Sequence, residues 1–156
     1  MILVISVLAV TSMRNVASSE IVSGNVRTTE LATQAADIAL RHCESSVVKL
    51  MADPASAVPL DLPLAKIRPA ATDAWKSTTI WDQSLTPFAL DAVFVGGAAT
   101  FTRPPECMVE LLTGAVGTLP ASFVITARGF GPEVTTPANS GRPAGTVVWL
   151  QSTLDF

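Results

Sequence analysis

Hydrophobic and polar positions follow a helical period along the first third of the chain. An uncharged, mostly apolar stretch, residues 1–13, leads into a segment that contains no proline before Pro54. Within that segment apolar side chains recur every three or four residues, which defines one face of an α-helix: Ala32, Ala36, Ala39, Cys43, Val47 and Leu50. Polar side chains hold the opposite positions: Glu30, Gln34, Asp37, Arg41 and Glu44. The pattern predicts one long helix over residues 1–51, whose second half packs against a small core.

Two local signals mark a weak point and an end of this helix. Gly24 lies between Ser23 and Asn25, and a glycine costs about 1 kcal/mol relative to alanine in a helix interior. A bend or local melting is therefore least costly at Gly24, and a tolerated surface glycine explains the residue equally well. Asp53-Pro54 predicts the end of the helix, because proline lacks the N–H group that the next turn needs.

The remaining residues, 52–156, predict a β-rich head. The expected strands are β-branched and aromatic runs between glycines and prolines: residues 92–95, 100–102, 107–112, 122–128 and 146–154. Because consecutive strands are joined by turns, we expect an antiparallel meander with one face on the helix. The predicted fold class is α+β, with residues 1–17 as an apolar membrane segment and residues 18–51 as the amphipathic half of the helix.

Three connections complete this interpretation. Residues 52–71 contain four prolines and predict a loop. Residues 74–82 predict a short helix or turn that covers a sheet edge with Trp75 and Trp81, with an exposed tryptophan pair used for binding as the alternative. Residues 129–145, rich in proline and glycine, predict an exposed and mobile connection between the last two strands.

Composition changes this picture in one respect. Charged residues make up 15% of the 156 positions and hydrophobic residues 49%, which is less charge than a typical soluble domain carries. Part of the apolar surface is therefore expected to meet a membrane or a partner protein. The net charge is −3 without a basic run, so we expect no nucleic-acid partner.

The apolar start has three interpretations. Its 13 residues are fewer than the roughly 20 that span a bilayer as a helix. A secretory signal has an apolar region of roughly this length, but no basic residue precedes this one and no Ala-x-Ala-like site follows promptly. A buried core helix is the second interpretation. We favour the third, a membrane helix cut short at Met1, either by a misassigned start codon or because the sequence is a fragment.

The two cysteines predict one disulfide in an oxidising compartment. Cys43 lies on the helix face that packs against the sheet, and Cys107 opens a predicted strand. Closing a loop of this length stabilises the fold by about 4 kcal/mol in the chain-entropy treatment. Two buried free thiols are the alternative.

The sequence offers few groups for catalysis. His42 is the single histidine and tyrosine is absent. In His42-Cys43-Glu44 the adjacent helix positions point about 100° apart and cannot share one tetrahedral metal ion. Four loop aspartates form no paired-carboxylate pattern: Asp61, Asp73, Asp82 and Asp91. Gly114-Ala115-Val116-Gly117 lacks both the dinucleotide and the phosphate-loop signatures and is more simply a turn. We expect no enzyme activity, no cofactor and no metal.

With these elements placed, several sequence blocks carry a family resemblance. They are Met13-Arg14 at the end of the apolar run, SGNVR at 23–27, LATQAADIALR at 31–41, PECMVE at 105–110, ITARG at 125–129 and VVWLQS at 147–152. They resemble type IV pilins, specifically the PilX-type minor pilins of pilus assembly. That family has an Ala-Gly-Asn-Leu-Arg block before a Leu-Ala-x-Gln-Ala-Ala-Glu-x-Ala-Leu-Arg helix, and a closing pair of strands. Residues 52–102 match only loosely.

The resemblance implies a structural subunit with a pilin-like fold. Such a precursor is anchored in the bacterial inner membrane with its head in the periplasm, cleaved by a prepilin peptidase and assembled into an extracellular pilus. The partners implied are other minor and major pilins and the assembly machinery. No Gly-Phe junction precedes Met1, and the glutamate expected near the start of the helix is absent.

The residues expected to matter follow from this interpretation. Leu3, Val4, Val7 and Leu8 are expected to anchor the subunit and to pack in the filament, Gly24 to give helix flexibility, and Cys43 with Cys107 to form the disulfide. A pseudopilin of a type II secretion system is the first alternative function, although the acidic cluster of a calcium site is not evident near the C-terminal end. The second is a periplasmic binding or adhesion module behind a signal segment.

Overall fold

The computed structural model covers the whole chain and describes all residues except 1, 56–60, 71, 83–86, 91–100 and 136–141. For residues 2–19 and for residue 21 it describes the backbone alone. Among the described residues the elements follow one another as a long helix, three short helical turns and four strands. The predicted α+β class is confirmed.

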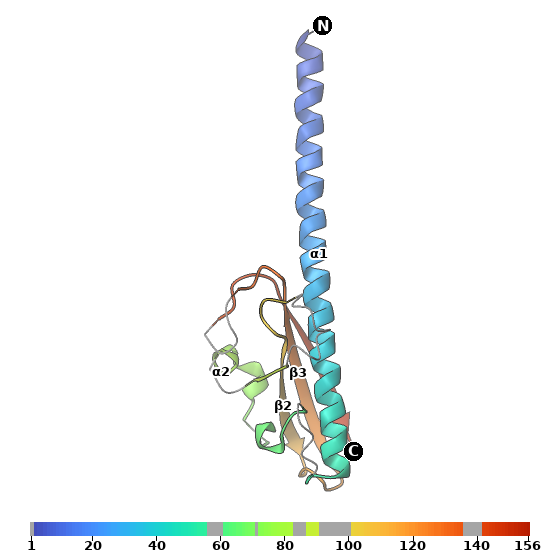
Figure 1. Cartoon of the computed structure of the whole chain (residues 1–156), viewed down its shortest axis with the longest axis vertical. Coiled ribbons are helices and arrows are strands. Elements are labelled where there is room, and N and C mark those ends of the chain that lie inside the picture. The colour runs from blue at the N-terminus through green and yellow to red at the C-terminus, as the bar shows by residue number, and fades with distance from the viewer. Residues whose placement is uncertain (1, 56–60, 71, 83–86, 91–100, 136–141) are drawn as a thin grey trace.

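The helix α1 (Ile2–Ala52) runs unbroken along the length of the molecule. Figure 1 shows its N-terminal part projecting beyond the head and its C-terminal part lying along the sheet. Helical structure continues through Gly24, and the backbone oxygen of Asn25 accepts a bond from the Thr29 hydroxyl at 2.8 Å. A Cβ atom at Gly24 would meet nothing within 4 Å. Gly24 is thus a surface glycine inside continuous helical structure, and its role in helix flexibility stays a prediction.

The C-terminal end of α1 agrees with the prediction. Asp53 donates its backbone N–H to the oxygen of Lys49 at 2.9 Å, and its side chain accepts from the N–H of Ala55 at 3.0 Å. This local bond stabilises a turn in place of another helical turn. Pro54 follows and cannot extend the helical hydrogen bonds.

The sheet has four antiparallel strands in the order β1-β2-β3-β4. They are β1 (Phe88–Ala89), β2 (Glu106–Thr113), β3 (Ser122–Phe130) and β4 (Val147–Asp155). The predicted meander and its last three strands are therefore confirmed. Phe101-Thr102 does not form the strand expected there, and residues 92–95 and Thr100 lie outside the described residues. The two-residue β1 was not predicted.

The apolar face of α1 packs on one side of this sheet. All six side chains predicted for that face are at most 5% exposed, and Ala39, Cys43 and Val47 join Val109, Phe123 and Ile125 in the core. Gly129 on β3 allows this close approach, because a Cβ atom there would overlap the backbone at Ala32 and Ala36. Small residues on both elements let the helix lie directly on the sheet.

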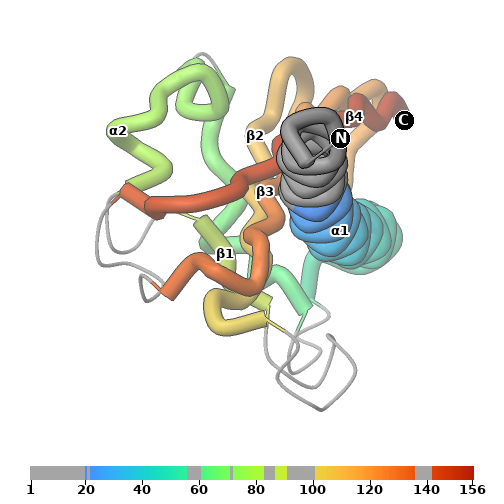
Figure 2. The backbone as a smooth tube through the Cα atoms, turned by 90° about the horizontal axis from the view of Figure 1, so that it is seen from above, coloured from blue at the N-terminus to red at the C-terminus, as the bar shows by residue number. Residues whose placement is uncertain are grey.

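A second layer covers the other side of the sheet, as the view from above in Figure 2 shows. It contains the 3-10 turn η2 (Ala74–Lys76) and the short helix α2 (Thr78–Trp81). The 3-10 turn η1 (Leu64–Lys66) precedes them in the chain, just before Arg68 pairs with Glu110 of β2. The predicted short helical segment is confirmed. Trp81 is 1% exposed and Trp75 half-buried, so they do not form the exposed pair considered as the alternative.

The connection between β3 and β4 is in part packed rather than exposed. Gly131 and Val134 are buried, and the Glu133 carboxylate accepts a bond from the Thr146 backbone N–H at 2.7 Å. A hydrogen bond from the Thr146 side chain, aided by backbone donors, lowers the pKa of Glu133. The expectation of a wholly exposed connection was wrong for residues 131 and 134; residues 136–141 lie outside the described part.

Candidate functional site

The projecting part of α1 presents apolar side chains to solvent. Val22 is 60% exposed and Val26 62%, and with Asn25, Thr29 and Glu30 they line a shallow surface groove. The predicted assembly residues lie about four to five helical turns nearer the N-terminus than Val22 on the same helix, where only the backbone is described: Leu3, Val4, Val7 and Leu8. In the part of the chain whose side chains are described, no helix is long and apolar enough to cross a lipid bilayer.

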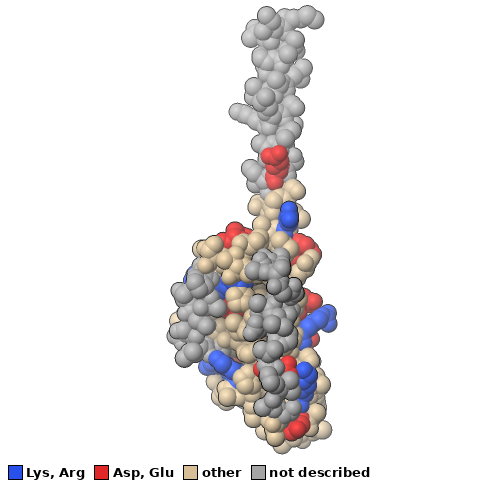
Figure 3. Space-filling view, in the orientation of Figure 1, with Lys and Arg blue, Asp and Glu red and all other residues tan. Residues whose placement is uncertain are grey.

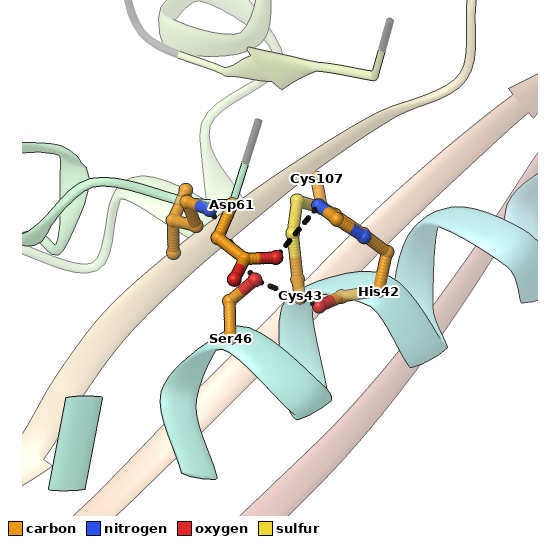
Figure 4. Close-up of a disulfide and its surroundings, with 6 residues drawn as sticks. His42, Cys43, Ser46, Asp61 and Cys107 are labelled. Atoms are coloured by element: carbon orange, nitrogen blue, oxygen red, sulfur yellow. Dashed lines mark hydrogen bonds and ion pairs between the residues drawn. A yellow bond between two sulfur atoms is a disulfide. The ribbon is translucent and has the colours of Figure 1, made fainter. Parts of the chain in front are cut away.

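The disulfide site joins α1 to the sheet. Cys43 and Cys107 lie at disulfide distance, with Cα atoms 6.6 Å apart, inside the roughly 4.4–6.8 Å usual for such bonds. Both cysteines are fully buried and are separated by 64 residues in the chain. Figure 4 shows the bond between the helix and the strand behind it. It holds the end of β2 that also pairs with β1.

Polar side chains beside the disulfide attach the segment after α1. The Ser46 hydroxyl donates to the His42 oxygen at 2.9 Å and accepts from the Leu62 N–H at 3.2 Å. Asp61 accepts from the Lys49 ammonium at 2.8 Å and lies 4.0 Å from Nε2 of His42 (Figure 4). These contacts give His42 and Asp61 a role in positioning the loop on the helix.

A buried charged cluster lies on the opposite side of the sheet. Strand register places Glu106, Arg128 and Trp149 in one row across β2, β3 and β4. Arg128 Nε donates to Glu106 Oε2 at 2.7 Å, and Arg103 Nη2 donates to Glu106 Oε1 at 2.9 Å. Both arginines are 1% exposed and Glu106 is fully buried. One carboxylate is thus shared by two guanidinium groups.

Arg128 also holds α2 on the sheet. Its Nη2 donates to the Trp81 backbone oxygen at 2.6 Å and its Nη1 to Asp82 Oδ1 at 3.1 Å. The guanidinium carbon lies 5.1 Å from the Trp81 ring centre and 5.5 Å from that of Trp149, at cation–π distance. Sequence reasoning missed this cluster. The available signal was an arginine inside the apolar strand pattern, because a buried charge requires a partner.

The other residues that were considered for catalysis or ligand binding lie in ion pairs and turns. Asp73 pairs with Lys76 at 3.0 Å, and Gly114 and Gly117 adopt positive φ angles in the turn between β2 and β3. Asp91 lies outside the described residues. Over the described ranges, no three histidine, cysteine or acidic side chains are grouped so that they could hold a metal ion.

The face shown in Figure 3 carries acidic and basic side chains interspersed over the head. Comparisons of the chain with protein-family models, with curated proteins and with solved structures give no match.

Proposed function

We propose that the protein is a structural subunit of a type IV pilus or of its priming or tip complex, a minor pilin of the PilX type. Its long helix leaves the lipid phase and packs against the helices of neighbouring subunits. The head remains outside this helical core. The partners are other minor and major pilins and the assembly machinery, and the protein is located in the bacterial inner membrane and in the extracellular pilus.

One observation carries the proposal: α1 extends beyond the head, and its described projecting part exposes Val22 and Val26. An exposed apolar helix surface is unfavourable in water, and burial against protein stabilises it by about 25 cal/mol per Å². Nearer the N-terminus the sequence has the uncharged, mostly apolar residues 1–13. A helix of this kind fits subunit packing better than it fits catalysis.

The anchoring of the head supports the same function. A subunit held by its helix transmits force to its head only if the two are firmly connected. Here the buried face of α1, the Cys43–Cys107 pair and the close approach at Gly129 connect them. The head is thus attached along the lower half of the helix, and the upper half is left for neighbours.

The experiment compares one substitution at three helix positions in the cell that makes the protein. Leu8→Asp and Val26→Asp introduce a charge into the proposed packing surface, whereas Val48→Asp introduces it beside the head at a side chain that is 51% exposed. We expect the first two variants to be lost from sheared filaments and the third to be retained. Normal incorporation of Leu8→Asp, with normal piliation, would contradict the proposal.

A further inference from the structure

A cavity of about 280 Å³ opens where α2 meets the segment leading into β4. Figures 1 and 2 both show this segment beside α2. The lining residues relevant to binding are Thr78, Asp82, Arg128, Arg142 and Trp149. The volume is near the lower end of the range for small-molecule sites, which suits a ligand with a single ring.

Among the described residues that line the cavity, Arg142 is a cation outside the ion-paired cluster around Arg128. Arg128 is bonded to Glu106 and Asp82, and Glu106 also accepts from Arg103, so these four groups neutralise one another. Arg142 adds a further positive charge at the rim, where it is exposed. Within the described part of the chain it forms no ion pair. A guanidinium in this position matches a carboxylate through two parallel hydrogen bonds.

The cavity also offers an acceptor and a flat wall. Asp82 uses Oδ1 for Arg128, and Oδ2 has no partner among the described residues. A carboxylate oxygen is a hydrogen-bond acceptor for a hydroxyl group and repels a second carboxylate. Trp149 is 42% exposed, and edge contact with Trp81 at 4.8 Å between ring centres fixes its orientation. Its exposed ring is a surface for the apolar face of a ligand ring.

We propose that this cavity binds an acidic monosaccharide, a single ring that carries one carboxylate and several hydroxyl groups. The carboxylate pairs with Arg142, a hydroxyl donates to Asp82, and the C–H face of the ring lies on Trp149. The ion pair with Arg128 holds Asp82, and the contacts with Arg128 and with the Trp81 ring hold Trp149, before the ligand arrives, so little ordering accompanies binding. The inference goes beyond the proposed function, since it concerns what the head recognises.

The experiment measures binding of D-galacturonate to the full chain by isothermal titration calorimetry, with D-galactose as the neutral match. We expect saturable binding of galacturonate and at least about tenfold weaker binding of galactose, because galactose lacks the carboxylate that pairs with Arg142. Arg142→Gln removes this preference. Arg41→Gln, which changes an exposed arginine on α1, leaves it unchanged.

Three results would overturn the inference. They are no saturable binding of galacturonate to the parent chain, equal affinity for galactose, and unchanged galacturonate affinity in Arg142→Gln. Because Arg142 is exposed and has no described ion pair, its replacement is not expected to affect folding. An unchanged unfolding midpoint in that variant verifies this point.

Discussion

At the scale of single residues, Gly129 and Glu106 explain how the two faces of β3 are used. On one face Gly129 leaves room for the backbone of α1. On the other face, Glu106 of β2 compensates the buried charge of Arg128. The periodicity of a helix or strand does not reveal either requirement, because each depends on a contact with a residue far away in the sequence.

Replacement of Gly129 by alanine is expected to lower the free energy of unfolding by about 1–3 kcal/mol, the usual cost of overpacking. The added methyl group overlaps backbone atoms of α1, which cannot move as a side chain can. Gly24→Ala is the matched control, expected to stabilise by up to about 1 kcal/mol because its site is open. Urea unfolding followed by tryptophan fluorescence measures both. Equal stability of the Gly129→Ala variant and the parent would contradict the packing described.

Glu106→Gln is expected to destabilise the head by about 3–5 kcal/mol, because it leaves two buried guanidinium groups without their shared negative charge. Glu30→Gln, on the exposed face of α1, is expected to change stability by less than about 0.5 kcal/mol. The same urea titration compares the two variants. Similar midpoints for both would show that the buried carboxylate does not stabilise the fold.

At the scale of elements, the spacing of apolar residues predicted the long helix and the longer strands. The helix face from Ala32 to Leu50 and the strands β2, β3 and β4 were predicted because burial on a core imposes a regular spacing of apolar residues. The strand β1 has two residues, too few for a pattern. Phe101-Thr102 has strand-forming residues but is not part of a strand, and the preceding residues 91–100 lie outside the described part of the chain.

The candidate sites were predictable to different extents. Cys43 and Cys107 were paired by reasoning from the helix face and the strand order, because these place both cysteines at one interface. The cavity between α2 and β4 was not predicted from the sequence. Its lining residues come from distant segments, and only the folded structure brings these segments together. Long-range placement, rather than residue type, limited the prediction.

The disulfide provides a test at this scale. Loss of the Cys43–Cys107 bond in the double variant Cys43→Ser, Cys107→Ser is expected to lower stability by about 4 kcal/mol, because the unfolded chain gains the freedom of a 64-residue loop. Mass spectrometry of the alkylated parent, before and after reduction, reports whether the bond is present. Free thiols in the unreduced protein would contradict the pairing.

At the scale of the whole molecule, the protein is a helix with a head attached along its lower half. The α1–sheet interface and the buried ion pairs hold the head together, while the upper helix presents Val22 and Val26 to its surroundings. This arrangement separates the functions of the upper part of α1 and of the head. We propose assembly for the upper helix and ligand recognition for the head.

The recovery of the protein in sheared surface filaments tests the assembly function most directly. Filaments are sheared from the cells, separated from membranes and periplasm, and probed with an antibody raised against residues 101–135 of the head. Our account predicts that the chain is found in the filament and inner-membrane fractions. Recovery of all of it as soluble periplasmic protein, with filaments that lack it, would contradict the account.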